Sequence, residues 1–384
     1  MTRLTFILTL IITFNIASYS QKYAVNFGCD TINPEKKQVA QLWINYLKSK
    51  PDSIYDNSYW SIQEKNKYKC YDFLKSEGFI NPSLYYFNLY NEILSISEYE
   101  DGYLIRSAFH YGSTPINIMA ITNVVARKEK GKYVLANYTP YYTRDWNTTI
   151  VGLITYKYFP EYEFDSVKAK EANEFLQTVC EVFELPEEAL TYYITRNCDD
   201  IHRAKGFDFV ITMGGNKDCG FIDDCNNIIY ATALAGENHQ HELIHIVNKR
   251  YPNAHDYLLV GISSYWGGNT AHGAKPLIYH IKRLNDYLIQ NSHINLNYFT
   301  SQEATMMDFE TNPMYVYGAL LIDIVLRKGG INELKRLMSI EMSDEELINY
   351  LRKELNTDDL NQYFRNRLSE ISKDDKFEAV NLKF

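Results

Sequence analysis

Polar and apolar positions in the first part of the chain predict one helix followed by several strands. Asn33 can cap a helix that Pro34 opens. The apolar stripe of this helix comprises Val39, Leu42, Trp43, Tyr46 and Leu47. Two hairpins are expected where Asp101-Gly102 and Lys130-Gly131 separate runs of alternating polarity, and β-rich sequence continues to about Phe159. These patterns predict a small α+β module.

Helical periodicity dominates the remainder of the chain. Residues 167–183 form an amphipathic pattern, and two strands are expected at 190–195 and 227–231. Two helices should follow, one over 238–249 and one from about His255 to Gly267-Gly268. The rest, from 276 to 372, is mostly amphipathic helix. Gly329-Gly330 is expected to close one helix there, and Ser343 to start another.

The first residues have the pattern of a secretory signal peptide. Arg3 precedes an apolar run over 4–17, and small residues lead to a cleavage site near Ser20. The run is too short to span a bilayer, and no other stretch is long enough. The mature chain is therefore predicted to be exported, to the periplasm or the extracellular space, without a transmembrane segment. A net charge of −9 without basic clusters argues against a nucleic-acid partner.

The six cysteines fit disulfides in an exported protein better than a metal site, because no CxxC pair is present. Six cysteines allow fifteen connectivities, and the sequence does not choose among them. Proximity along the chain suggests the pairs Cys219–Cys225, Cys180–Cys198 and Cys29–Cys70.

The clearest chemical signal is the HExxH sequence that begins at His241 and ends at His245. Residues four apart share one face of a helix, so both imidazoles can bind one metal ion. Glu242 then lies beside that ion and can take a proton from a bound water. The pattern predicts a Zn²⁺ site with His241 and His245 as ligands and Glu242 as the general base. The strand before it is expected to be an edge strand that holds a substrate backbone.

Three segments resemble the peptidase MA-like branch of the gluzincin metallopeptidases. They are 230–245, the Tyr-Leu-Leu-Val-Gly-Ile-Ser-Ser-Tyr-Trp-Gly-Gly segment from Tyr257, and the Tyr-Val-Tyr-Gly-Ala-Leu-Leu segment from Tyr315. The resemblance covers about 167–337. It implies an α+β, zincin-like fold in which His241 and His245 hold zinc and Glu242 is the general base.

The expected organisation is a signal peptide over 1–20 and an N-terminal α+β module over 21–165. A zincin-like HExxH subdomain over 166–270 and a helical C-terminal subdomain over 271–384 follow. The resemblance does not cover the N-terminal module.

One position departs from the gluzincin pattern. The family's third zinc ligand is a glutamate directly before a glycine, and alignment on Gly261 puts Val260 in its place. The alternative HExxHxxGxxH pattern is also absent, since Asn248 and Tyr251 stand at its glycine and histidine positions. Asp256, one turn before Val260, could replace the ligand or could cap the helix. More distant candidates are His255, His272, Asp308 and Glu310.

The sequence thus predicts an exported zinc-dependent metallopeptidase that acts on a peptide or protein. Tyr315, Tyr317 or His272 could donate a hydrogen bond to the oxyanion. The alternative is a peptidase-like protein, impaired in catalysis, that binds a peptide, protein or glycan. A serine hydrolase is not supported because no G-x-S-x-G elbow is present.

Overall fold

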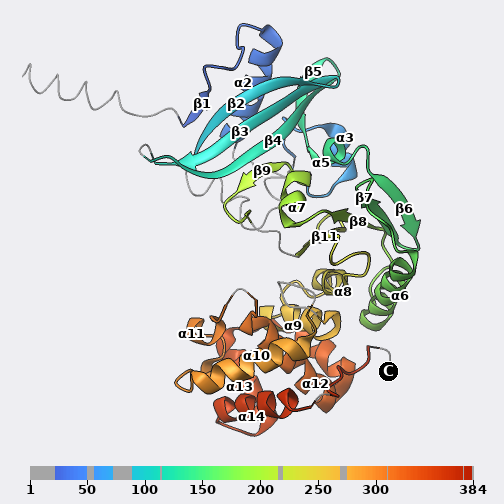
Figure 1. The fold of residues 1–384 in the computed structure, drawn as a ribbon, viewed down its shortest axis with the longest axis vertical. Coiled ribbons are helices and arrows are strands. Elements are labelled where there is room, and N and C mark those ends of the chain that lie inside the picture. The colour runs from blue at the N-terminus through green and yellow to red at the C-terminus, as the bar shows by residue number, and fades with distance from the viewer. Residues whose placement is uncertain are drawn as a thin grey trace, which may run out of the picture. The chain divides into compact units, whose positions relative to one another are not determined.

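The computed structural model describes residues 22–49, 56–71, 89–112, 115–214, 219–268, 275–308, 310–374 and 376–382. The predicted signal peptide, 1–20, lies outside these ranges. The fold is α+β, with a β-rich N-terminal part and a helical C-terminal part, which confirms the predicted class (Figure 1). Within the described ranges, no helix has the length and apolar character needed to cross a membrane.

The chain divides into two compact units. One comprises Met1–Tyr142 and His202–Met213, and the other comprises Thr143–Ile201 and Gly214–Phe384. This division differs from the expected boundary near 165. The reason is strand pairing: β6 (Asn147–Val151) and β7 (Ile154–Tyr158) belong to the sheet of the second unit.

The first unit contains a sheet with the strand order β1-β2-β3-β4-β5, and β9 pairs with β4. Both predicted hairpins are present, as β2–β3 and β4–β5. The elements of this unit are β1 (Tyr23–Val25), α2 (Pro34–Lys48), α3 (Ile62–Lys67), β2 (Tyr90–Tyr99), β3 (Gly102–Tyr111), β4 (Asn117–Glu129), β5 (Lys132–Ala136), α5 (Thr139–Tyr142) and β9 (Phe207–Val210).

Helix α2 begins and packs as its sequence predicts. The side-chain oxygen of Asn33 accepts hydrogen bonds from the amides of Glu35 (2.9 Å) and Lys36 (3.2 Å). All five residues of the predicted apolar stripe are buried. Trp43 also donates its indole N–H to the side chain of Asn91 on β2, at 3.0 Å, so the helix is fixed on the sheet by a satisfied polar contact.

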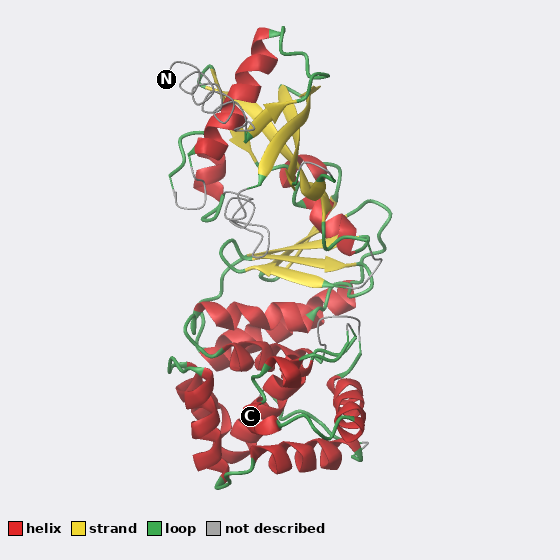
Figure 2. Cartoon of the chain, turned by 90° about the vertical axis from the view of Figure 1, so that its left-hand side faces the viewer, coloured by secondary structure: helices red, strands yellow, loops and turns green. Residues whose placement is uncertain are grey.

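The sheet of the second unit has the order β10-β11-β8-β7-β6. Its three central strands are parallel and both edge pairs are antiparallel. Figure 2 shows the helices on one side of this sheet. Besides β6 and β7, the elements are α6 (Ser166–Phe183), β8 (Leu190–Thr195), β10 (Gly220–Asp223), β11 (Ile228–Thr232), α8 (Gln240–Ile244), η3 (His245–Lys249), α9 (Asp256–Gly267), α10 (Leu277–Gln290), η4 (Leu296–Tyr298), α11 (Gln302–Thr305), α12 (Pro313–Met338), α13 (Asp344–Leu355) and α14 (Leu360–Ser372). A further helix, α7 (Cys198–Ala204), runs across the division between the units.

Two glycines allow α9 and α12 to cross in close contact. A Cβ on Gly261 would lie 2.5 Å from the carbonyl oxygen of Gly318, and a Cβ on Gly318 would lie 2.5 Å from that of Tyr257. Further along α12, Gly330 has a non-helical backbone conformation, with φ +66° and ψ −167°, so one helical stretch ends there and another begins, as the sequence predicts. The predicted start of α13 is confirmed, because Ser343 and Glu346 form a capping box.

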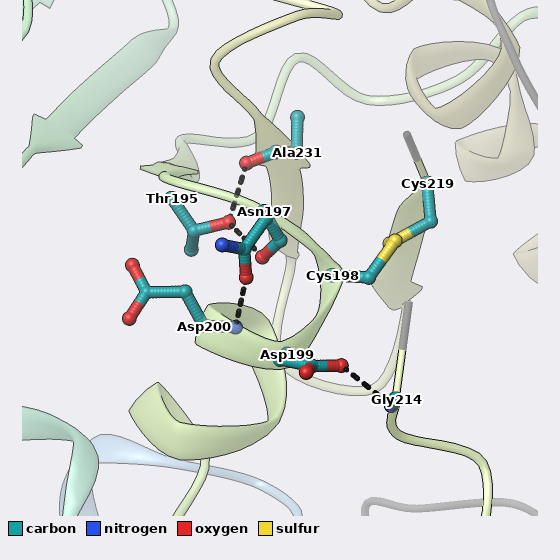
Figure 3. Close-up of a disulfide and its surroundings, with 8 residues drawn as sticks. All are labelled: Thr195, Asn197, Cys198, Asp199, Asp200, Gly214, Cys219 and Ala231. Carbon is teal, nitrogen blue, oxygen red and sulfur yellow. Dashed lines mark hydrogen bonds between the residues drawn. A yellow bond between two sulfur atoms is a disulfide. The ribbon is translucent and has the colours of Figure 1, made fainter. Parts of the chain in front are cut away.

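A disulfide joins Cys198 to Cys219 (Figure 3), and Cys70 and Cys225 are also disulfide-bonded. Cys29 and Cys180 are free thiols. All three pairs suggested by proximity along the chain are therefore wrong. Strand order explains the observed bond. Cys198 follows the end of β8, and Cys219 precedes the start of β10. Both of these strand ends lie beside Ala231 of β11, so the two cysteines are close together.

Candidate active site

The HExxH residues lie on a short helix beneath the second sheet. The predicted helix over 238–249 forms as one α-helical turn, α8, which continues as the 3₁₀ segment η3 from His245. Leu243 packs in the apolar core between the sheet and α6. Because that side of α8 is anchored in the core, His241 and Glu242 face the opposite elements, β10, α9 and α12, as the contacts below show.

The imidazole rings of His241 and His245 lie close together, with their planes at a steep angle to each other. The ring centroids of His241 and His245 are 5.2 Å apart, with an angle of 76° between the ring planes. Two imidazoles on one tetrahedral zinc ion would have centroids about 5 Å apart, given zinc–nitrogen bonds of about 2 Å. His241 and Glu242 are buried. The pair therefore has the spacing that a shared metal ion requires.

Two glycines let neighbouring backbone approach these side chains. A Cβ on Gly220, in β10, would lie 2.5 Å from Cγ of Glu242 and 2.5 Å from Cε1 of His239. A Cβ on Gly267, at the end of α9, would lie 2.5 Å from the backbone nitrogen of His241. A side chain at Gly267 would push α9 away from the backbone of α8, and one at Gly220 would displace either β10 or the side chains of Glu242 and His239.

The strand that borders the site is β10, not the predicted β11. β11 is an interior strand with β10 on one side and β8 on the other. β10 is the edge strand, and Gly220 places it directly against Glu242. Its position was missed because four residues give too short an alternation to be recognised in sequence.

Of the two tyrosines proposed as oxyanion donors, only Tyr315 lies at the site. Its ring stacks on His241 with a centroid distance of 5.9 Å. Burial and the nearby Glu242 carboxylate raise the pKa of Tyr315, so its hydroxyl stays protonated. Tyr317 is instead fully buried in the helical core, between Phe299 and Phe364.

Burial sets the charge of the site. It raises the pKa of Glu242 to about 8, because a buried carboxylate loses its hydration. Burial lowers the pKa of His245 to about 4, although Asn248 and Asp224 act in the opposite direction. It also lowers the pKa of His239 to about 4. The imidazoles of His239 and His245 are therefore neutral at pH 7, which is the form that binds metal ions.

The proposed replacement ligands lie elsewhere. Asp256 is exposed at the start of α9, about 16 Å along the helix axis from Gly267. It does not cap α9 either; His255 does, by accepting a hydrogen bond from the amide of Tyr257 at 3.3 Å. The imidazole of His255 also bonds to Asp344, at 3.0 Å.

Neither of the two remaining candidates that the structure describes, Asp308 and Glu310, supplies a ligand. Asp308 and Glu310 form ion pairs with Arg283, and His272 lies outside the described residues. Val260, half-buried, offers only its carbonyl, which accepts bonds from two serine hydroxyls of α9. In the described part of the chain, no three His, Cys, Asp or Glu side chains converge as a metal site.

His239 is a site residue that the sequence reasoning missed. It is buried, its ring centroid is 6.2 Å from that of His241, and its Nδ1 has no hydrogen-bond partner among the described residues. The signal was present in the sequence as a third histidine two positions before the motif, in the order His-Gln-His-Glu.

No protein-family model and no curated protein matches this sequence. Among solved structures, the chain is similar to an aminopeptidase N family protein from Idiomarina loihiensis, with 14% sequence identity and a TM-score of 0.33. The similarity covers 67% of this chain and 52% of that protein, so the chain spans about half the length of that structure.

Proposed function

We propose that the protein is an exported zinc-dependent peptidase, with His241 and His245 as zinc ligands and Glu242 as the general base. The observation that carries this proposal is the pair of imidazoles, buried at His241 and half-buried at His245, whose centroids lie 5.2 Å apart, with the buried Glu242 between them in sequence and against the edge strand β10. Paired imidazoles beside a carboxyl group and an open strand edge are among the parts that a zinc peptidase needs.

A catalytic zinc ion usually has three protein ligands, and the site supplies two of them. His241 and His245 supply nitrogen donors at a suitable spacing. The described residues do not supply a third donor at the same point. We therefore assign the two histidines as ligands and leave the third position unassigned.

The residues of the chain have separate roles in this proposal. A zinc ion, when bound, would polarise the scissile carbonyl and lower the pKa of a water molecule. β10 can bind an extended peptide through its outer edge by backbone hydrogen bonds. The positive charge of a bound zinc ion would lower the raised pKa of Glu242, so that its carboxylate could take the proton of the attacking water and give it to the leaving amine. The protonated Tyr315 hydroxyl can donate a hydrogen bond to the developing oxyanion.

The disulfide supports export. Cys198 and Cys219 are bonded, and disulfides persist in oxidising compartments such as the periplasm and the extracellular space. The bond lies next to the site, because Cys219 immediately precedes Gly220.

The test combines metal analysis with peptide cleavage on the purified mature chain. We expect one zinc per chain in the wild type and after Glu242→Gln, and loss of zinc after His241→Ala. Glu242→Gln should lower cleavage of a mixed fluorogenic peptide library by about 10³-fold or more. His293→Ala is the matched control, since His293 is an exposed histidine that pairs with Glu303 outside the site. Full cleavage by the Glu242→Gln variant would rule out the proposed base.

A second candidate is a peptidase-like protein that binds peptides without cleaving them. It is favoured by the lack of a third donor among the described residues and by Val260 in α9. Peptide binding by the zinc-loaded wild type, unchanged in Glu242→Gln and without cleavage in either, would support this candidate over the enzyme.

A further inference from the structure

A cavity of about 220 Å³ lies between α6 and η3, next to the HExxH segment but lined by different residues. Leu176 and Cys180 come from α6, Leu190 begins β8, and Ile246 belongs to η3. All of these elements belong to the second unit. The cavity is thus built on the rigid sheet and helices of one unit.

The interior of this cavity is apolar and large enough for a ligand. An engineered cavity of about 150 Å³ with aliphatic and aromatic walls binds benzene and excludes water. Here Leu176 and Leu190 are buried, and the buried thiol of Cys180 is free. Burial raises the pKa of Cys180, so the thiol stays neutral and behaves as a small apolar group. An apolar body about the size of a benzene ring or an eight-carbon chain is the group that such walls accommodate.

Charged side chains lie at the solvent-exposed side of the cavity. Lys249 is 3.6 Å from the carboxylate of Glu188 and also hydrogen-bonds to Asn227, which donates to Glu188 at 2.8 Å. The opposite charges of Lys249 and Glu188 therefore neutralise each other. Arg250 also lines the cavity and is exposed.

Arg250 is the uncompensated cation at this position. It makes no ion pair within the described parts of the chain. The positive charge of Arg250 acts on Glu184, whose carboxylate is paired with Lys335 at 2.7 Å, and on the hydroxyl of Tyr251, to which Arg250 also hydrogen-bonds. The positive charge next to an apolar cavity therefore lacks a matched anion within the protein itself.

We propose that this cavity binds a small apolar monocarboxylate, with the apolar body between α6 and η3 and the carboxylate at Arg250. The proposal does not depend on the peptidase function, because the cavity has no residue in common with the HExxH motif. A cation would be repelled by Arg250, and a neutral alcohol would form a weaker hydrogen bond with it than a carboxylate does.

The test uses calorimetric titration of the metal-free mature protein with four probes. Octanoate and 3-phenylpropionate carry the proposed carboxylate, whereas octylamine and octanol have the apolar chain without it. We expect saturable binding of at least one carboxylate, one molecule per chain, and at least about tenfold weaker binding of octylamine and octanol. Binding of only one carboxylate would show whether the apolar body is a chain or a ring, and either result supports the proposal.

Two variants locate the binding. Arg250→Gln should weaken carboxylate binding about tenfold, whereas Lys373→Gln, at the exposed C-cap residue of α14, should not change it. Leu190→Trp should abolish binding by filling the cavity.

Because Leu190→Trp can also disturb β8, a labelling experiment on the wild-type protein provides a second test of the location. Octanoate should slow the reaction of Cys180 with N-ethylmaleimide and leave Cys29, in the other unit, unaffected.

Three results would overturn the proposal. They are the absence of saturable binding by either carboxylate, equal affinity for octylamine, and unchanged affinity after Arg250→Gln.

Discussion

Gly267 lies directly against the backbone of His241: a Cβ on this glycine would be 2.5 Å from both the nitrogen and the Cα of the histidine. This close approach brings the end of α9 onto the first turn of α8. The position of the first HExxH imidazole thus depends on the absence of a side chain in another helix.

We expect Gly267→Ala to separate the two helices and to weaken metal binding. The added methyl group meets backbone, which cannot rotate away, and overpacking of this kind costs about 1–3 kcal/mol. Gly268→Asn is the control, because Gly268 has φ +71° and open space around it, and asparagine tolerates that conformation. Thermal unfolding and zinc titration measure both effects. Equal stability and zinc affinity in Gly267→Ala and the wild type would contradict the proposed contact.

Gly220→Ala should affect catalysis and spare metal binding. Its Cβ would lie 2.5 Å from Cγ of Glu242, so the carboxylate or the edge strand must move, while His241 and His245 are not touched. We expect peptide cleavage to fall by about tenfold or more, which corresponds to about 1.4 kcal/mol in the activation free energy, with one zinc retained. Ile222→Val, on the same strand, adds no atoms and should keep wild-type activity. A loss of zinc in Gly220→Ala would show that β10 positions the ligands and not only the base.

His239→Gln decides whether the metal has two histidine ligands or three. The ring centroid of His239 is 6.2 Å from that of His241, farther than the 5.2 Å that separates His241 from His245. We therefore expect His239→Gln to keep one zinc per chain, with His245→Gln losing it. Metal analysis after dialysis gives the answer. Equal loss of zinc in both variants would make His239 the third ligand.

Removal of the disulfide should destabilise the second unit. The bond between Cys198 and Cys219 closes a loop of 21 residues, and loops of this size correspond to about 3 kcal/mol of stabilisation. Denaturant unfolding of the Cys198→Ser/Cys219→Ser double variant measures the loss. Cys180→Ser, at a buried free thiol, serves as the control for replacing a cysteine. A stability equal to that of Cys180→Ser would mean that the bond contributes little.

His280 should make the protein less stable in acid. Its side chain is fully buried, its Nδ1 bonds to the hydroxyl of Thr311 at 3.0 Å, and burial lowers its pKa from 6.5 to about 4. Between these values the unfolded chain binds a proton that the folded chain does not. The stabilising contribution is thus complete above pH 6.5 and is lost as the pH falls toward 4. The charges of Arg283, Asp308 and Glu310 also act on His280.

The comparison is with His280→Asn, which can keep the bond to Thr311. Across this pH interval we expect the wild type to lose about 2 kcal/mol more stability than the variant, as solvent screening reduces the full effect. Denaturant unfolding at several pH values measures the difference. All other histidines are the same in both proteins, so parallel pH profiles would exclude a role for His280.

Local patterns allowed most elements to be predicted. The Asn33 cap, the 101–102 and 130–131 turns and the Ser343 capping box depend on contacts within a few residues, and each is present. The proximity of His241 to His245 follows in the same way from one helical turn.

Pairings between distant segments were not accessible to the same reasoning. The Cys198–Cys219 bond depends on β11 lying between β8 and β10, and local spacing favoured other pairs. The exposed location of Asp256 depends on where α9 meets α8.

The sequence by itself determined the α+β class, the helix starts and the HExxH grouping, because these depend on periodicity and on neighbours within about one turn. Only the tertiary structure decided which strand borders Glu242, which tyrosine meets His241 and which cysteines bond. Those relationships depend on sheet order and on close approach of backbones at Gly220 and Gly267, and an isolated glycine does not reveal which partner it accommodates.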